Sequence, residues 1–280
     1  MQVGVCLPNT IPGVPADLLR GWALRADAGP FSSLAVLDRV AYDSYEPFAA
    51  LAAAAAVTQR IGLATTVVIG PLRSTGMLAK QAATVDALSG GRLILGLAVG
   101  ARTEDYDAAG VDPRGRGRRL DEQLARLRSC WESDRMGPVT ARPGGPPLLI
   151  GGTSSDQAFA RVARYADGYI HGGGPPPLFA GAASRARAAW TDAGRPGKPL
   201  LWGQGYFALG DPEAGAAYVR DYYAFTGPFA ERIAAGLLTT PQAIRQYMRG
   251  YEDAGCDELI LIPAVANLDQ LDRLADVVAQ

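Results

Sequence analysis

Short apolar segments rich in Val, Ile and Leu alternate along the whole chain with longer segments of helical periodicity. Most of the apolar segments lack in-and-out alternation, which is typical of parallel strands that are buried on both faces. The pattern predicts eight strands: Val3–Leu7, Leu34–Asp38, Ile61–Ile69, Leu93–Val99, Pro147–Gly151, Gly168–His171, Leu200–Ala208 and Glu258–Ile262.

The segments between these strands carry apolar residues at helical spacing. Asn267 is the expected N-cap of the last helix, because its side chain can accept a hydrogen bond from an amide of the first turn. A long segment after the seventh strand has room for two or three helices. The predicted helical regions are Ala16–Ala26, Glu46–Gln59, Thr75–Leu88, Arg118–Trp131, Ser155–Tyr165, Leu178–Ala193, Pro212–Ala254 and Asn267–Ala279.

Eight strands that alternate with eight helical regions predict an α/β fold, the (β/α)8 TIM barrel, with an elaborated segment after strand seven. An open doubly wound sheet is the alternative, although such a sheet is usually shorter or carries a second domain. No linker or repeat divides the chain, so we expect a single domain over residues 1–280. In a barrel of this kind, chemistry lies on the loops that follow the strands.

The charge balance gives little reason to expect a nucleic acid or membrane partner. The 280 residues include 27 Lys and Arg against 28 Asp and Glu, a formal net charge of −1. The longest apolar run, Phe48–Val57, is about half of a membrane span. The three cysteines are widely spaced and form neither a disulfide framework nor a metal-ligand pattern. We therefore expect a cytoplasmic protein without a metal, whose partner is a small-molecule substrate.

Two glycines end the fifth predicted strand and open a helix. In the segment Gly151, Gly152 and Thr153, missing side chains let backbone amides approach an anion, and the helix N-terminus adds positive partial charge. A cofactor phosphate fits such a site. A tight turn with Ser154 or Ser155 as N-cap explains the same residues.

Asp38 and Arg39 end the second predicted strand and His171 ends the sixth, so all three are candidates for catalysis. Asp38 and Arg39 either pair with each other or hold a polar substrate. His171 is suited to acid/base work or to a structural role. Gly96, within strand four, makes room for a flat ring or for core side chains. Because the sequence lacks HExxH, GxSxG and Walker motifs, an organic cofactor must carry difficult chemistry.

The central part of the chain resembles the luciferase-like flavin-dependent oxidoreductases. The most specific signature is the block Leu78–Leu93 followed by Leu95–Gly100. The supporting segments occur in the family's order over nearly the whole chain: Tyr45–Phe48, Ile61–Val67, Arg116–Leu120, Ile150–Thr153, Tyr165–Tyr169 and Ala254–Leu259.

The resemblance implies a barrel that binds FMN or the deazaflavin F420 at its C-terminal mouth. It implies that Thr66 and Val67 back the ring, with a non-prolyl cis peptide between them, and it supports the phosphate interpretation of the glycine turn. It also implies a homodimer, for which the alanine-rich helix Pro47–Val57 is a candidate surface. The same ring would be lined by Val99, Gly100 and Ala101.

One position departs from the family's pattern. Several F420-dependent members carry a histidine after the strand-two aspartate, where this chain has Arg39. A guanidinium stays protonated and cannot shuttle a proton. Arg39 is better suited to hold an anionic substrate group or to stabilise an oxyanion.

These features favour an enzyme that performs two-electron redox on a small organic substrate. F420-linked hydride transfer is preferred to FMNH2-dependent monooxygenation, because the chain is compact and Arg114–Arg119 offers cations to an anionic cofactor tail. The missing histidine argues against F420. A non-catalytic flavin-binding accessory protein is the remaining alternative.

Overall fold

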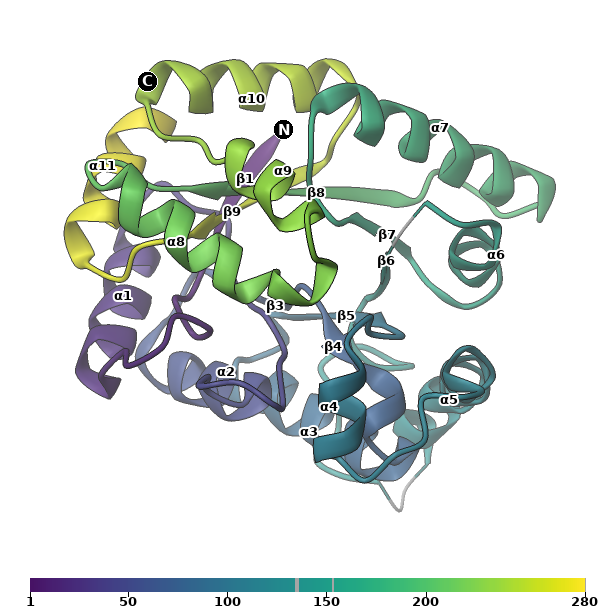
Figure 1. The fold of residues 1–280 in the computed structure, drawn as a ribbon. Coiled ribbons are helices and arrows are strands. Elements are labelled where there is room, and N and C mark those ends of the chain that lie inside the picture. The colour runs from purple at the N-terminus through teal and green to yellow at the C-terminus, as the bar shows by residue number, and fades with distance from the viewer. Residues whose placement is uncertain (134–135, 153, 280) are drawn as a thin grey trace.

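A closed parallel barrel forms the centre of the molecule in the computed structural model, which describes residues 1–133, 136–152 and 154–279 (Figure 1). The strands pair in the order β3-β2-β1-β9-β8-β7-β6-β5-β4, and a β3–β5 pairing closes the ring. Since β3 and β4 together take the place of one strand, this is the predicted (β/α)8 barrel. The strands are β1 (Gln2–Cys6), β2 (Ser33–Val36), β3 (Gly62–Thr65), β4 (Val68–Ile69), β5 (Leu93–Ala98), β6 (Leu148–Gly152), β7 (Gly168–His171), β8 (Leu200–Phe207) and β9 (Glu258–Pro263).

Helices surround this barrel on the outside (Figure 1). They are α1 (Ala16–Ala28), α2 (Pro47–Val57), α3 (Thr75–Leu88), α4 (Thr103–Ala108), α5 (Arg116–Glu132), α6 (Asp156–Tyr165), α7 (Pro176–Asp192), α8 (Pro212–Tyr222), α9 (Phe229–Ala235), α10 (Pro241–Asp253) and α11 (Leu268–Val278), with short 3-10 turns η1 (Gly70–Leu72) and η2 (Ala224–Thr226). Among the described residues, none of the helices is long and apolar enough to cross a membrane.

The helix predictions hold well at the termini. Asn267 caps α11 by accepting from the amide of Gln270 at 3.0 Å, and Ser155 caps α6. Glu46 is the N-cap of α2 rather than its first residue, which corrects the predicted start of that helix, because its carboxylate accepts from the amide of Ala49. The segment after β8 holds three helices, α8 to α10, as expected. The short helix α4 has no counterpart in the prediction, because it is only six residues long.

The predicted strand Ile61–Ile69 is broken in the structure, and this corrects the prediction. β3 ends at Thr65, the Thr66–Val67 peptide is cis as expected from the resemblance, and β4 resumes at Val68. β3 pairs with β2 over its whole length, whereas β4 pairs with β5 alone, through Val68 with Leu97 and Ile69 with Ala98.

Glycines make room for the break inside the barrel. A Cβ added at Gly96 would lie 2.7 Å from Ile170 Cδ1 and 3.1 Å from Val67 Cγ1, and one added at Gly151 would lie 2.5 Å from Val67 Cγ1. These distances are too short for real side chains. Gly96 therefore accommodates core neighbours, the Thr65 carbonyl and Ile170 above all, which favours the second of its two interpretations.

Candidate active site at the barrel mouth

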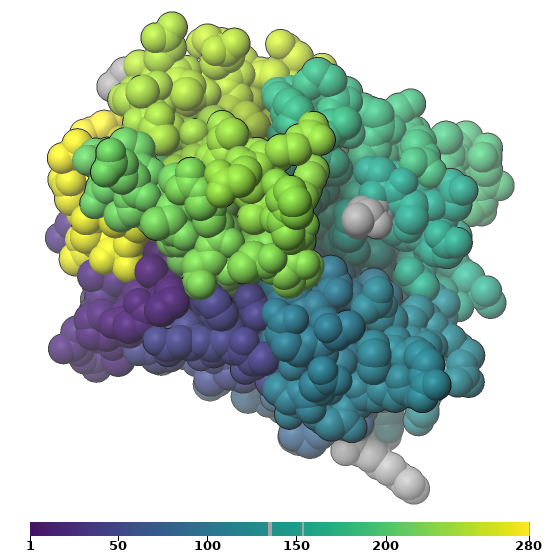
Figure 2. Space-filling view, viewed as in Figure 1, coloured from purple at the N-terminus to yellow at the C-terminus, as the bar shows by residue number. Residues whose placement is uncertain are grey.

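The loops after the strands surround a hollow on the face of the molecule seen in Figure 2. The hollow lies between the green surface of α8 and α9, the blue surface around α4 and the teal surface that follows β6. In a TIM barrel this C-terminal end carries the chemistry.

The Thr66–Val67 peptide forms a platform at the base of the mouth. The Thr66 amide donates to the Val36 carbonyl at 2.8 Å, and the Gln204 side-chain amide donates to the Thr66 carbonyl at 3.3 Å. Thr66 is buried, whereas Val67 is partly exposed. The backbone is thus held from two sides of the barrel, and the partly exposed Val67 packs its side chain beside Gly96 and Gly151.

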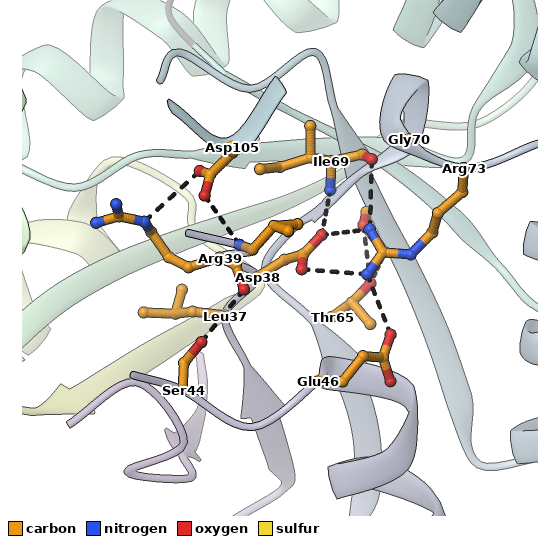
Figure 3. A network of polar contacts seen from close by, with 12 residues as sticks. Leu37, Asp38, Arg39, Ser44, Glu46, Thr65, Ile69, Gly70, Arg73 and Asp105 are labelled. Atoms are coloured by element: carbon orange, nitrogen blue, oxygen red, sulfur yellow. Dashed lines mark hydrogen bonds and ion pairs between the residues drawn. The ribbon is translucent and has the colours of Figure 1, made fainter. Parts of the chain in front are cut away.

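Asp38 is buried and holds the second half of the broken strand (Figure 3). Its Oδ2 accepts from the amide of Ile69 at 2.8 Å and from Arg73 Nη1 at 2.6 Å, while Arg73 Nη2 donates to Oδ1 at 3.2 Å. Arg73 also donates to Glu46 at 3.1 Å. Burial raises the pKa of Asp38, and the Arg73 guanidinium counteracts this shift. Of the two interpretations of Asp38 and Arg39, mutual pairing is therefore wrong, because the partner of Asp38 is Arg73.

Arg39 points away from Asp38 and toward Asp105 of α4 (Figure 3), and it also contacts the end of α8. Its Nη2 donates to Glu104 at 3.0 Å, its Nε lies 3.6 Å from Asp105 Oδ2, and its Nη1 donates to the Tyr222 carbonyl at 3.4 Å. Asp105 is fully buried and also accepts from two backbone amides of the loop after β2. Protein groups therefore surround the guanidinium, and the predicted substrate contact stays a prediction.

A second arginine, Arg102, converges on the same carbonyl. Arg102 Nη2 donates to Tyr222 O at 3.3 Å, and its guanidinium carbon lies 4.5 Å from the centre of the Tyr222 ring and 4.4 Å from that of Phe225. Tyr222 ends α8, where backbone carbonyls favour cations. Arg39 and Arg102 thus tie the inserted segment α8–η2 to the loops after β2 and β5. The sequence analysis missed Arg102, since an isolated arginine in a loop gives no signal.

A cluster of tyrosines lines the same wall of the mouth and was also missed. Tyr218 bonds Thr10 at 2.8 Å, and the hydroxyl groups of Tyr206 and Tyr223 lie 3.2 Å apart. Neighbouring rings in the α8–η2 segment contact each other with centroid separations of 5.1 to 5.7 Å. The Tyr42 hydroxyl donates to Asp221. Sequence spacing within α8 predicts part of this cluster, but not the contribution of β8.

The glycine turn after β6 lies beside the loop after β7, because Gly152 is in register with His171. An added Cβ at Gly152 or at Gly172 would meet no atom within 4 Å, so both positions face open space. Gly152 has φ of +140°, which only glycine adopts readily. Thr153 lies outside the described residues. Gly172 carries no signal of its own in the sequence, and only the strand register places it here.

His171 lies on the helix side of β7, away from the Asp38 and Arg39 pairings. Its ring packs edge-on against Phe179 of α7 at 5.9 Å, and burial lowers its pKa, which favours the neutral imidazole. Its Nδ1 is buried without a hydrogen-bond partner among the described residues. The structure therefore does not bring the three predicted catalytic residues together, and the acid/base role of His171 stays a prediction.

The segment after β5 edges the mouth on another side. Val99 and Gly100 are partly exposed and Ala101 is exposed, and the Tyr106 hydroxyl donates to the Val99 carbonyl at 2.5 Å. Their role in lining a cofactor ring stays a prediction. Among the described residues, no group of three or more His, Cys, Asp and Glu side chains is placed so that it could hold a metal ion.

Comparison with known proteins shows which family the chain belongs to. A family model described as luciferase-like monooxygenase matches residues 1–271. The chain belongs to this family. Its members are oxidoreductases and monooxygenases that use a flavin or F420.

The similar proteins include monooxygenases and an F420-dependent dehydrogenase. Pyrimidine monooxygenase RutA of Escherichia coli is 34% identical over 172 residues, which are 54% of this chain and 46% of RutA. The monooxygenase RslO1 from Streptomyces bottropensis has a TM-score of 0.79 at 20% identity and covers 100% of this chain and 98% of its own. An F420-dependent secondary alcohol dehydrogenase in complex with an F420-acetone adduct has a TM-score of 0.79 at 17% identity, over 99% and 97%. At these identities the structural likeness shows the fold alone.

Replacing Arg73 with Ala tests the support of the broken strand. The change leaves the Asp38 carboxylate buried without its cation, so we expect the free energy of unfolding to fall by about 3–5 kcal/mol. Urea denaturation followed by tryptophan fluorescence measures it. Arg114→Ala is the control, because the Arg114 side chain is 91% exposed and its removal should leave the midpoint unchanged. Equal midpoints for both variants would contradict the supporting role.

Replacing Arg102 with Ala tests the tie to the inserted segment. The Tyr222 carbonyl loses one of its two arginine donors and the aromatic cluster loses one of its two cations, so amide hydrogen exchange over residues 218–226 should become several-fold faster. Exchange in β8 should not change. Arg118→Ala, which removes an exposed pair with Glu122, is the matched control. Unaltered exchange in the Arg102 variant would show that the segment is held without this residue.

Proposed function

We propose that the protein is an F420- or FMN-dependent oxidoreductase that carries out two-electron redox on a small organic substrate, with F420-linked hydride transfer as the preferred reaction. The observation that carries the proposal is the Thr66–Val67 platform. A flat ring needs a rigid apolar support, and Val67 is partly exposed at the mouth while its backbone is fixed by Val36 and Gln204.

The loops after β6 and β7 fit the phosphate of such a cofactor. Gly152 and Gly172 face open space, so an anion can approach the backbone of both loops without meeting a side chain. The N-terminus of α6 follows the first of these loops and contributes positive partial charge. The residues present therefore suit a group with a planar ring at one end and a phosphate at the other.

Once bound, the cofactor would supply the electron pair for the reaction. The chain's own residues would do the rest. Val67 would support the ring, Gly152 and Gly172 would admit the phosphate, and the α8–η2 segment would restrict access of water. Arg39 and Arg102 would keep that segment in place.

The contacts of the arginine cluster, Arg114–Arg119, do little to decide whether the cofactor is F420 or FMN. Arg114 pairs with Asp112 at 2.9 Å, Arg119 donates to the Asp112 carbonyl, and Arg118 pairs with Glu122 at 3.4 Å. These contacts hold the cations within their own segment, so the preference for F420 rests on the compact chain. FMN-dependent monooxygenation is the second candidate, which the names of RutA and RslO1 favour.

Replacing Gly172 with Val tests the phosphate site. Gly172 has an ordinary backbone conformation and free space around its Cα, so valine can enter without strain and would exclude the anion. We expect affinity for the bound cofactor, FMN or F420, to fall about ten- to a hundred-fold, the equivalent of one charge-assisted hydrogen bond. Fluorescence titration of the full chain with each cofactor measures this change.

The matched control is Gly181→Val on the exposed face of α7, which also has no neighbour within 4 Å of an added Cβ. Its cofactor affinity should equal that of the unaltered protein. Equal affinities for all three proteins would refute the phosphate assignment. Failure of the unaltered protein to bind either cofactor would refute the proposed function itself.

A further inference from the structure

Two tyrosine hydroxyls meet at the mouth from different parts of the chain. Tyr206 lies on β8 and Tyr223 directly follows α8, and their hydroxyl oxygens are 3.2 Å apart. Both side chains are partly exposed, whereas Tyr218 and Tyr222 beside them are buried. Among the cluster's tyrosines on β8 and the α8–η2 segment, the Tyr206–Tyr223 pair is therefore the part that is partly exposed.

The position of Tyr206 along β8 places the pair above the platform. Gln204 points into the barrel and donates to the Thr66 carbonyl, so Gln204 lies at the same height along the barrel axis as the platform. Tyr206 is two residues further along the strand, so it faces the same side and lies roughly 6.6 Å nearer the mouth. A ring supported by Val67 would have this pair on its open side.

The pair also has an unused donor. When one hydroxyl donates to the other, the second retains its own proton, and neither makes another hydrogen bond within the described part of the chain. Other buried tyrosines are satisfied by the protein: Tyr218 bonds Thr10, and Tyr251 donates to the Gly174 carbonyl at 2.9 Å. An O–H group that reaches accessible space without an acceptor is available to a ligand.

This donor is neutral. Burial raises the pKa of Tyr206 and of Tyr223, so both hydroxyls remain protonated at ordinary pH. A neutral hydroxyl can donate to an uncharged oxygen, such as a carbonyl oxygen, without needing a charge on the ligand.

We propose that the Tyr206–Tyr223 hydroxyl pair donates the hydrogen bond that binds the oxygen atom of an uncharged substrate above the cofactor ring. This inference rests on the proposed function for the position of the ring. It makes the two tyrosines specificity-determining residues of the site, one supplied by the barrel and the other by the inserted segment.

The test compares ligands that differ only in the oxygen. Three ketones, 2-butanone, cyclohexanone and acetophenone, are each matched with the hydrocarbon in which a methylene group replaces the oxygen. Titration calorimetry on the full chain, loaded with the cofactor that it binds, gives the ratio of the two dissociation constants. In the variant Tyr206→Phe/Tyr223→Phe, the ratio should shift about three- to ten-fold against the ketone for at least one pair of ligands.

The control is Tyr218→Phe, which removes a hydroxyl of the same cluster that is already bonded to Thr10, and its ratio should equal that of the unaltered protein. Circular dichroism verifies folding, and Tyr223→Phe alone replaces the double variant if the latter does not fold. Binding of none of the ketones, an unchanged ratio for every pair, or an equal shift in the control would overturn the proposal.

Cofactor titration separates this proposal from the one on which it rests. The double variant should bind the cofactor as tightly as the unaltered protein, because neither hydroxyl contacts the platform or the glycine loops. If the unaltered protein binds neither cofactor, the proposed function fails on that result. The same ketone series on the full chain without cofactor then still decides whether the hydroxyl pair binds the oxygen.

Discussion

The hydrogen bonds of one buried carboxylate hold the architecture of the barrel mouth together. Asp38, at the end of β2, fixes the Ile69 amide of β4 and the Arg73 guanidinium, so it secures the chain just beyond the break in the strand. Val36 and Gln204 fix the peptide at the break itself. Because residues of β2, of the loop after it and of β8 restrain one short segment, Val67 can be partly exposed and still occupy a defined position. Such restraint is what a site for a planar ligand requires.

Asp38 and Arg39 are adjacent in the loop after β2 but contact different parts of the molecule. Asp38 faces the broken strand, whereas Arg39 faces Asp105 and the end of α8. The pair therefore joins the platform to the inserted segment through a single loop. Arg102 reinforces the second connection from the loop after β5, and the tyrosines of α8 and β8 fill the space between. The loop after β2 thus supports both the Thr66–Val67 platform at the base of the mouth and the wall formed by the tyrosines.

Much of the fold could be predicted from the sequence, because buried parallel strands and helix caps such as Asn267 depend on local patterns. The cis peptide at Thr66–Val67 was predicted from the family resemblance alone, and the break in the strand was not predicted, because the apolar run Ile61–Ile69 looks continuous. Pairings between distant loops could not be predicted. Arg73 lies 35 positions from Asp38, and nothing in the sequence distinguishes it from Arg39 as the partner. The Tyr206–Tyr223 contact likewise depends on how the inserted segment folds back over β8.

The most direct measurement is a crystal structure of the full chain with FMN or F420 bound. It should show the ring against Val67, with the Tyr206 and Tyr223 hydroxyls on its open side, and the phosphate between the loops that contain Gly152 and Gly172. A cofactor bound elsewhere on the molecule, or a mouth that stays empty at saturating cofactor, would contradict the account.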